Sequence, residues 1–292
     1  MKAGFIGLGH LGQAMAGRLV SQGVDLILWN RTTKKAADFA KEHGCRVAET
    51  PSTLAADSSV IILNLFDSSA VKSVLAGPGG LLEGDLAGRL LIDTTTNHFR
   101  DVLEFHRIVS SRGGLYLEAP VLGSVVPASR GELTVLASGE ETAFEMALPY
   151  LQNLATNIFY LQEPALASRM KLVNNLVLGS FMATIAEAVA FGEAAGLDRD
   201  RVLEILASGA GNSGVLNAKR EKLACQDFSP HFQSSLIYKD MHYLQDLAYD
   251  LKRPLFMGSA VKELYGMTYA RGEEKLDFSA IYTVLKDLQR RQ

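Results

Sequence analysis

Three glycines near the start of the chain have a spacing that can hold phosphate groups. The segment "MKAGFIGLGHLGQAMAGRL" places Gly7, Gly9 and Gly12 behind a short apolar run, in the pattern G-x-G-x-x-G. In that pattern the first glycine allows a tight turn, the second lets the backbone approach a pyrophosphate, and the third lets a helix pack closely on a strand. A helix N-terminus also offers unpaired N–H groups and a positive dipole end to the phosphates. The alternative is a purely structural turn of another strand–helix unit.

A basic turn follows the next apolar segment. In "DLILWNRTTKK", Asn30, Arg31 and Thr32 come directly after a predicted strand over residues 25–29. Asn30 lies 18 residues after Gly12, near the spacing of about 20 at which an NAD site carries an acidic residue for the ribose 2′-hydroxyl. A guanidinium instead binds a 2′-phosphate through paired, charge-assisted hydrogen bonds. We therefore predict that this turn and the glycine-rich loop, including Leu8, His10 and Leu11, bind NADP in preference to NAD; a solvated basic turn is the alternative.

A lysine and an asparagine four residues apart could carry proton transfer. Lys171 and Asn175 lie in "RMKLVNN", share one face of a predicted helix, and have Asn174 beside them. A lysine on an apolar, buried helix is costly without partners, and burial lowers its pKa toward the range that suits proton transfer. The alternative is a lysine in an exposed first turn whose ammonium extends into solvent.

Two further segments carry polar groups that could belong to a site. Lys239 and Asp240 in "LIYKDMHYL" read by default as an ion pair on a helix surface. The segment "DTTT" runs from Asp93 to Thr96 at the end of a predicted strand. Hydroxyls at the carboxyl ends of parallel strands line the ligand crevice of such folds, and they also cap helices.

Strands and helices alternate through the first half of the chain. Strands are predicted at residues 3–6 and 25–29 and within "SSVIILNLF", "GRLLIDTTT", "GGLYLEAPVL", "GELTVLASG" and "NIFYL", the last strand; helices are predicted at residues 13–20, 34–43, 100–111 and 140–153. This alternation behind a glycine-rich first turn predicts an α/β fold with a doubly wound parallel sheet.

The pattern changes near residues 162–165. Residues 165–195 predict one helix that Gly196 ends, and about 30 residues of helix extend about 45 Å. Apolar residues cover most of its circumference, so it must be surrounded by protein, which favours a homodimer or homotetramer. Further helices follow, so the second half is predicted to be all-α.

The composition limits the possible classes of protein. The chain has 292 residues, a net charge of −3, 48% hydrophobic and 21% charged residues, which is typical of a globular protein and favours neither nucleic acid nor an anionic membrane. We expect no membrane span and no signal peptide. The two cysteines, Cys45 and Cys225, are far apart in the sequence and are typical of reduced thiols in a cytoplasmic protein. The six histidines lack the spacing of metal ligands. We therefore expect a cytoplasmic protein without a metal site.

Six ordered motifs carry a resemblance over essentially the whole chain. "GFIGLGHLGQAMAGRL", "WNRT", "IDTTT", "EAPVLGS…GELTVLASG", "MKLVNN" and "YKDM" together resemble the β-hydroxyacid dehydrogenase family, which includes 3-hydroxyisobutyrate and 6-phosphogluconate dehydrogenases. The chain is most similar to the glyoxylate/succinic semialdehyde reductase branch. The resemblance implies a Rossmann domain over residues 1–162 that binds NADP. It also implies an all-helical domain for substrate and oligomerisation over residues 163–292, joined to the first by the long helix.

The resemblance also implies roles for single residues. Lys171 matches the catalytic lysine, and Asn175 matches the asparagine that positions the substrate and the lysine. The residues that match cofactor positions, besides the glycine-rich loop and the basic turn, are Leu65, Thr96 and Lys239. The residues that match substrate positions are Leu122, Gly123, Ser124, Phe232 and Asp240, the last of which orients Lys239.

The implied reaction is hydride transfer from NADPH to a small aldehyde acid such as glyoxylate or succinic semialdehyde. Lys171 as an ammonium stabilises the alkoxide and gives it a proton. Leu122 stands where the family has a serine that contacts the substrate carboxylate, Ala165 and Ala167 stand where it has glycines, and Phe99 stands where proline is common. The alternatives are an NADP-dependent β-hydroxyacid dehydrogenase with a less charged substrate, including an imine, and a non-catalytic dinucleotide-binding module.

Overall fold

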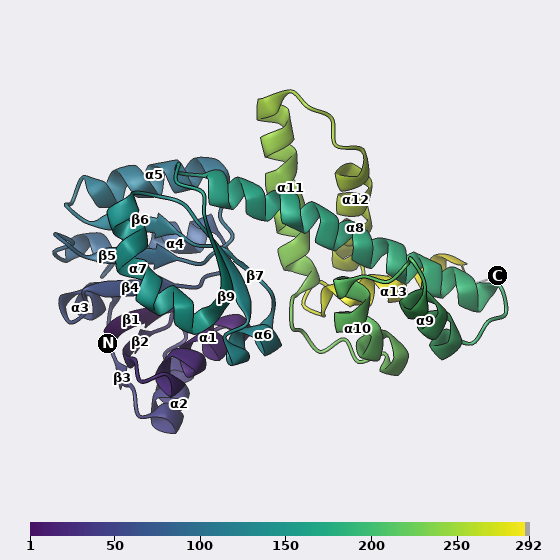
Figure 1. Cartoon of the computed structure of the whole chain (residues 1–292), viewed down its shortest axis with the longest axis horizontal. Coiled ribbons are helices and arrows are strands. Elements are labelled where there is room, and N and C mark those ends of the chain that lie inside the picture. Colours follow the sequence, from purple (N-terminus) through teal and green to yellow (C-terminus); the bar gives the residue numbers. More distant parts are fainter. Residues whose placement is uncertain (290–292) are drawn as a thin grey trace. The chain divides into compact units, whose positions relative to one another are not determined.

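Six parallel strands form the main sheet of the computed structural model, which describes residues 1–289 (Figure 1). The strands are β1 (Lys2–Ile6), β2 (Asp25–Trp29), β3 (Arg46–Val47), β4 (Val60–Leu63), β5 (Leu90–Asp93) and β6 (Leu115–Glu118). Their order across the sheet is β3-β2-β1-β4-β5-β6. This is the order of a dinucleotide-binding Rossmann fold, so the predicted doubly wound parallel sheet is confirmed.

Helices follow the strands and cover the sheet. They are α1 (His10–Ser21), α2 (Thr33–His43), α3 (Pro51–Ala56), α4 (Ser68–Ala76), α5 (Phe99–Ser110), α6 (Val125–Arg130) and α7 (Glu141–Leu154). α1 begins three residues before the predicted residue 13, so that Gly12 lies inside its first turn. A glycine is tolerated there because the turn packs against the glycine-rich loop itself.

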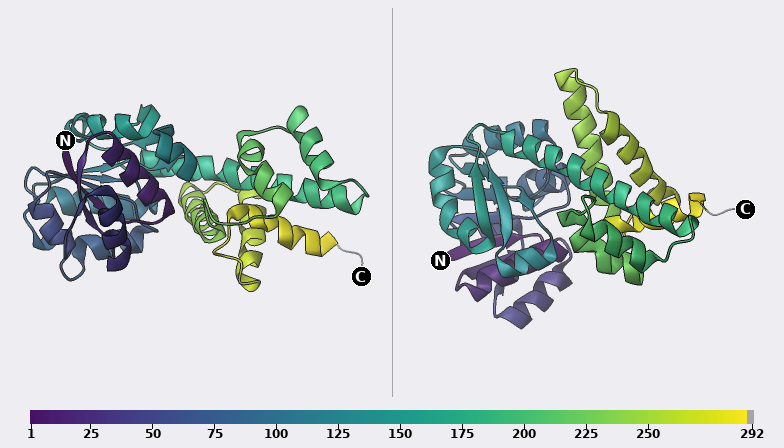
Figure 2. Two further views of the ribbon diagram at one scale, coloured as in Figure 1. Left: turned by 90° about the horizontal axis from the view of Figure 1, so that it is seen from below. Right: turned by 45° about the vertical axis from the view of Figure 1, so that its right-hand side comes forward.

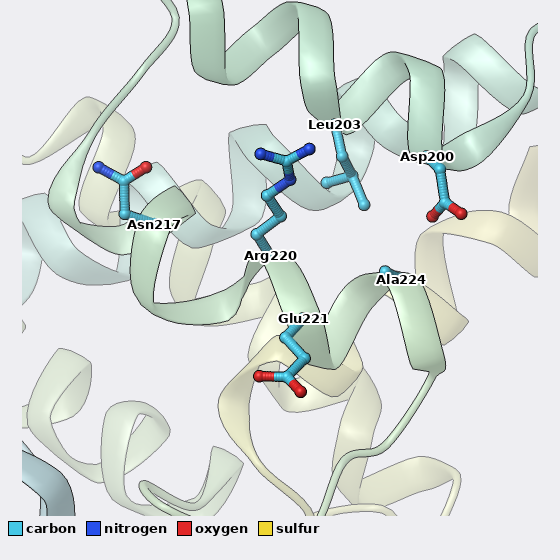
Figure 3. Close-up of a pocket in the computed structure, with 6 residues that line it drawn as sticks. All are labelled: Asp200, Leu203, Asn217, Arg220, Glu221 and Ala224. Carbon is cyan, nitrogen blue, oxygen red and sulfur yellow. The ribbon is translucent and has the colours of Figure 1, made fainter.

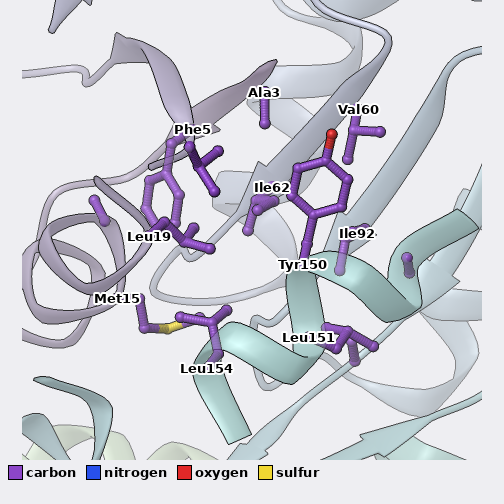
Figure 4. Close-up of a cluster of buried hydrophobic side chains, with 14 of the residues drawn as sticks. Ala3, Phe5, Met15, Leu19, Val60, Ile62, Ile92, Tyr150, Leu151 and Leu154 are labelled. Atoms are coloured by element: carbon purple, nitrogen blue, oxygen red, sulfur yellow. The ribbon is translucent and has the colours of Figure 1, made fainter. Parts of the chain in front are cut away.

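The alternation of side chains along the strands separates two faces of the sheet. Phe5 on β1, Ile62 on β4 and Ile92 on β5 point to one face, where they pack with Leu19 of α1 and Leu151 of α7 in a fully buried cluster (Figure 4). The residues between them in the strands point to the opposite face, because side chains alternate with a period of two. Asp93 and Glu118 belong to that opposite face, at the carboxyl ends of adjacent strands.

Three strands lie outside the main sheet. β7 (Val121–Leu122), β8 (Leu133–Ala137) and β9 (Ala155–Tyr160) form a separate three-stranded sheet in the order β7-β8-β9. "GGLYLEAPVL" was predicted as one strand, but it breaks at Ala119 and Pro120 into β6 and β7. Proline has no N–H to give to a ladder, so the chain turns there and enters the second sheet.

One long helix, α8 (Leu166–Ala194), follows β9 and confirms the predicted long helix. The chain divides into two compact units, Met1–Lys171 and the part from Leu172 on. The division therefore falls inside α8, one turn and a half after its start, whereas the boundary predicted from the sequence lies in the loop before the helix. The first turn of α8 packs with the first unit, which accounts for this difference.

The regular elements among the described residues of the second unit are helices. Besides the rest of α8 it contains α9 (Arg199–Ser208), α10 (Gly214–Cys225), α11 (Ser234–Leu251), α12 (Phe256–Ala270) and α13 (Ile281–Gln289). α11 and α12 lie side by side as an antiparallel pair (Figure 2). The last residues of the predicted helical domain, 290–292, lie outside the described part of the chain.

The expectation that no segment could span a membrane needs correction for α8. Within residues 1–289, α8 is the one helix that is long and apolar enough to cross a bilayer. The most hydrophobic part of α8 is 44% buried inside the protein. Core helices of globular proteins have the same length and composition, so this is weak support for a membrane span.

Candidate active site

The glycine-rich loop has the backbone that a pyrophosphate site requires. Gly7 has φ +104, and a Cβ on it would lie 2.2 Å from the Asn64 carbonyl oxygen. A Cβ on Gly12 would lie 2.0 Å from the Gly7 carbonyl oxygen. Gly9, the N-cap of α1, has no atom within 4 Å of its Cβ position and no side chain capping the helix. The first turn of α1 is therefore open on the side where the pattern places phosphates, and the loop fits a dinucleotide.

The turn after β2 connects to this loop. The Leu8 N–H donates to Asn30 Oδ1 at 2.9 Å, and Asn30 Nδ2 donates to the Thr32 carbonyl oxygen at 3.0 Å. Asn30 therefore holds the two loops together, while the Arg31 side chain is exposed. This arrangement leaves the Arg31 side chain accessible beyond the end of β2.

Buried Asp93 shapes the loop that carries Thr96. One of its carboxylate oxygens accepts from the Thr95 N–H at 2.9 Å, and the other accepts from Asn97 Nδ2 at 2.8 Å and the Tyr116 hydroxyl at 2.6 Å. Burial raises the pKa of Asp93, and the hydrogen bonds from these donors oppose that shift. Leu65 contacts this loop, because its N–H donates to Thr95 Oγ1 at 3.0 Å. Thr95 therefore helps to build the loop itself, and the residue that caps the next helix, α5, is His98.

The predicted substrate loop begins at the end of β7 and leads into α6. Gly123 has φ +126, and a Cβ there would lie 2.6 Å from Leu133 Cδ2, so only glycine fits. Leu122 and Ser124 on either side of it are both partly exposed. Ser124 is the N-cap residue of α6, but its hydroxyl makes no capping bond.

Lys171 is buried, with 7% of its surface exposed. Its Nζ donates to the carbonyl oxygen of Val121 at 2.9 Å. The alternative of a lysine that extends into solvent from an exposed turn is therefore wrong. The amine lies next to residues 122–124, so the first unit brings together Lys171 and the predicted substrate loop.

Asn175 and Asp240 form a buried pair in the second unit. Asn175 Nδ2 donates to Asp240 Oδ2 at 2.6 Å, and Asn174 Nδ2 donates to Asn175 Oδ1 at 3.1 Å. Lys239 Nζ lies 2.9 Å from the other oxygen of Asp240, which is only 1% exposed. Lys239–Asp240 is therefore no solvated surface pair. Asn175 follows Lys171 by four residues on α8, so helix geometry places both on one face.

The buried carboxylate of Asp277 holds the segment of Phe232. Asp277 Oδ2 accepts from Lys219 Nζ at 2.8 Å, from the His231 N–H at 3.0 Å and from the Phe232 N–H at 3.2 Å. The Phe232 ring meets the edge of the Phe278 ring with a centroid distance of 5.5 Å. Sequence reasoning assigned Phe232 a place in the substrate pocket, and it is this ion pair that orders its backbone.

Two family models together match almost the whole chain. Residues 2–162 match "NAD binding domain of 6-phosphogluconate dehydrogenase", and residues 166–285 match "NAD-binding of NADP-dependent 3-hydroxyisobutyrate dehydrogenase". The chain belongs to the β-hydroxyacid dehydrogenase family. Both descriptions name a dinucleotide-binding domain, so a nicotinamide dinucleotide is the cofactor that this fold accommodates.

Several relatives are similar over nearly the whole chain. Glyoxylate/succinic semialdehyde reductase 1 of Arabidopsis thaliana is 32% identical over 98% of this chain and 99% of its own. The cytokine-like nuclear factor N-PAC of Homo sapiens is 33% identical over 96% of this chain, which spans about half (51%) of that relative's length. The structure of 3-hydroxyisobutyrate dehydrogenase from Salmonella typhimurium, 26% identical, superimposes with a TM-score of 0.90 over 97% of this chain and 99% of that one.

Two hollows on this member of the β-hydroxyacid dehydrogenase family contain none of the residues of the predicted site. One, of about 460 Å³, lies between α9 and α10 and is lined by Asp200, Leu203, Asn217, Arg220, Glu221 and Ala224 (Figure 3). Another, of about 260 Å³, lies beside β3. Neither contains a residue that the sequence assigned to cofactor or substrate. Among residues 1–289 there is also no cluster of three or more side chains that could hold a metal ion.

Sequence reasoning missed one buried acid of this dehydrogenase fold. Glu118 ends β6 and is 1% exposed. Its carboxylate accepts hydrogen bonds from both the N–H and the hydroxyl of Ser168 in the first turn of α8. Glu118 lay inside the strand predicted within "GGLYLEAPVL", three residues ahead of the carbonyl that binds Lys171, and the sequence carried no local signal of its role.

Proposed function

We propose that this protein is an NADPH-dependent reductase of a small aldehyde acid of the glyoxylate or succinic semialdehyde type, with Lys171 as the proton donor. One observation carries the proposal: the buried Lys171 amine lies on the Val121 carbonyl, immediately before the predicted substrate loop. The Arabidopsis reductase, which is similar over its whole length, supports the substrate class.

In this reaction, Lys171 and Asn175 would have different roles. The nicotinamide would supply the hydride for the carbonyl carbon. Lys171, as an ammonium, stabilises the negative charge that builds on the carbonyl oxygen and then gives it a proton. Asn175, held by Asp240, presents its amide one helical turn away and orients the substrate. In the reverse direction, neutral Lys171 accepts the proton of the alcohol.

The preference for NADPH rests on the basic turn after β2. Arg31 is exposed beyond the strand end, and no carboxylate occupies the position that would bind a ribose 2′-hydroxyl and repel a 2′-phosphate. A guanidinium that pairs with the 2′-phosphate strengthens binding through two charge-assisted bonds. We expect NADH to be used less efficiently for this reason.

Leu122 affects which class of substrate the loop accepts. Leucine provides no hydroxyl for a carboxylate, and Ser124 is the nearest hydroxyl in the loop. An uncharged carbonyl or an imine would accept Leu122 as a neighbour more readily. A dehydrogenase acting on a less charged substrate is therefore the alternative within the same chemistry.

The experiment follows NADPH oxidation by its absorbance with glyoxylate, succinic semialdehyde, methylmalonate semialdehyde, an uncharged aldehyde and a cyclic imine, each repeated with NADH. We expect turnover of glyoxylate or succinic semialdehyde with NADPH. Turnover of only the uncharged aldehyde or the imine would replace the proposed substrate class by the alternative. No turnover of any compound would contradict the proposed activity.

The Lys171→Ala variant tests the proton donor. We expect turnover to fall by about 10²- to 10⁴-fold, the usual contribution of a positioned acid, while NADPH binding is retained. Lys222→Ala is the matched control, because Lys222 is similarly buried (8% exposed). Its Nζ donates to the Ser229 carbonyl oxygen at 2.7 Å, and Lys222 is not one of the predicted site residues. If both variants lose activity equally, or Lys171→Ala loses none, the assignment of Lys171 is wrong.

A non-catalytic dinucleotide-binding module is the second candidate function. It is favoured by one observation, the similarity to N-PAC proteins, which are named as nuclear factors. The buried Lys171 and the Asn175–Asp240 pair speak against it, because a binding module has no use for a held proton donor. NADPH binding without turnover of any compound in the panel would favour this candidate.

We also propose that the protein acts as a homodimer or homotetramer. Val173, Val177, Phe181 and Phe191 are exposed on α8, and their spacing of four, four and ten residues places them on one face. An exposed apolar stripe of this length is typical of a surface that another subunit covers.

A further inference from the structure

A carboxylate from the main sheet takes part in capping the helix that carries Lys171. The backbone N–H groups of a first helical turn have no partner within the helix. In α8 the Ala167 N–H donates to Ser138 Oγ at 3.0 Å, and the Ser168 N–H donates to Glu118 Oε2 at 3.0 Å. The Ser168 hydroxyl donates to the same oxygen of Glu118.

The same short segment holds α8 at two points. Glu118 meets Ser168 through its side chain, and Val121 meets Lys171 through its carbonyl oxygen at 2.9 Å. Both pairs are 50 residues apart in the chain. Because Ser168 and Lys171 are three residues apart, they lie on one face of the helix, one turn from each other. The position of the Lys171 amine therefore depends on the anchor at Ser168.

We propose that Glu118 is a positioning residue for Lys171: its carboxylate anchors the first turn of α8 and its negative charge favours the ammonium form of the amine one turn away. This inference rests on the proposed function for its kinetic consequence only. The placement of the carboxylate and the amine is independent of which carbonyl is reduced.

Several titratable and charged groups lie near Glu118. Asp93 on β5 is its register partner across the sheet, Tyr116 lies two residues before it, and the ring of His106 on α5 packs edge-on against Tyr116. On α8, Arg169 lies over the Phe99 ring at 5.8 Å, and Lys171 follows one turn after Ser168. Burial raises the pKa of Glu118 to about 7 and lowers the pKa of His106 to about 4, so His106 is neutral at pH 7. Of these groups, Lys171 is the cation that α8 brings to the same face as the carboxylate's anchor.

The Glu118→Gln variant removes the charge and keeps nearly the same shape. Removing a nearby anion lowers the pKa of an amine, so the alkaline limb of the kcat profile for carbonyl reduction should move to lower pH. We also expect kcat to fall by about tenfold or more while KM for NADPH stays within about twofold, because the glycine-rich loop is unchanged.

Ser138→Ala is the matched control. It removes the neutral cap from the same helical turn and leaves the Glu118 charge in place. We expect it to lower the melting temperature without moving the alkaline limb. A shift of the limb in Ser138→Ala equal to that in Glu118→Gln would show that helix capping alone is responsible, and would overturn the charge role.

A second readout does not depend on any substrate. In protein labelled at lysine ¹³Cε, the Lys171 signal is assigned by its loss in Lys171→Met, and its titration is compared in the wild type and Glu118→Gln. We expect a lower midpoint in the variant. An unchanged midpoint together with an unchanged kcat profile would overturn the proposal. If the wild type reduces no carbonyl, the proposed function fails, and the titration alone still decides the role of Glu118.

Discussion

At the scale of single residues, an alanine adopts a conformation that glycine usually takes. Ala165 has φ +70 and is fully buried, directly before α8. A left-handed backbone costs an L-residue about 1–2 kcal/mol, because its Cβ approaches the following carbonyl oxygen. Relatives of this family were expected to have glycine here, and the structure gives the physical reason. Ala167, the other departure before Lys171, lies inside the helix and carries no such strain.

The pair Ala165→Gly and Ala167→Gly measures this strain. Both alanines are fully buried, so the lost methyl group and the added freedom of the unfolded chain nearly cancel between the two variants. We expect Ala165→Gly to be more stable than Ala167→Gly by about 1–2 kcal/mol in the free energy of unfolding, because only Ala165→Gly relieves the left-handed conformation. Denaturant unfolding of both variants gives the difference, and equal stabilities would show that Ala165 is unstrained.

At the scale of elements, a buried ion pair orders the segment before α11. Asp277 is fully buried, Lys219 on α10 is 5% exposed, and their charges are 2.8 Å apart. Burial by itself would raise the pKa of Asp277, but the Lys219 ammonium holds it below its usual range. The carboxylate also accepts from the Ser279 N–H and hydroxyl and from the backbone of residues 231 and 232. One side chain thus joins α10, the Phe232 segment and the turn of residues 278–280 that precedes α13.

The Asp277→Asn variant should unfold more easily by about 3–5 kcal/mol, because it leaves the Lys219 charge buried without its partner. The matched control is Asp38→Asn, which breaks the exposed Lys34–Asp38 pair on α2. Exposed pairs of this kind contribute less than about 1 kcal/mol. Thermal or denaturant unfolding of both variants at neutral pH measures the two losses. Similar small losses would mean that Asp277 is not needed for the stability of the second unit.

At the scale of the whole molecule, the apolar stripe on α8 bears on assembly. Val173, Val177, Phe181 and Phe191 are between 44% and 67% exposed, which is unusual for large apolar side chains along one face of a helix. Burial of such a stripe between subunits would supply the driving force for association. The polar residues Lys171 and Asn175 point to the same helix's buried side, so the stripe is separate from them.

The double variant Val177→Glu/Phe181→Glu should dissociate the oligomer, because association would then bury two unpaired charges. Light scattering coupled to gel filtration measures the mass of the wild type and the variant. Leu103→Glu on α5 is the matched control, since Leu103 and Phe181 are each 46% exposed. A monomeric wild type would contradict the proposed homodimer or homotetramer, and dissociation by Leu103→Glu as well would assign the effect to charge alone.

The sequence by itself determined the main sheet and the conformation of the glycine-rich loop. The G-x-G-x-x-G spacing and the apolar strands follow from local rules of backbone and side-chain chemistry, so the strand–helix alternation was predicted correctly. The long helix was also predicted within one residue at each end, because glycine and the loss of apolar periodicity mark helix ends locally.

Only the tertiary structure decided how the polar groups are partnered. Lys171 is buried on the Val121 carbonyl, and Asp240 is buried against Asn175. The partners in these pairs are 50 and 65 positions apart, so local spacing in the sequence does not predict either contact. The same holds for β7, β8 and β9, whose separate sheet depends on the turn at Pro120 and on pairing between distant segments. Glu118 was overlooked because a carboxylate at a strand end has no local signature of its role. Long-range packing determines which charges lose water and which groups then receive their hydrogen bonds.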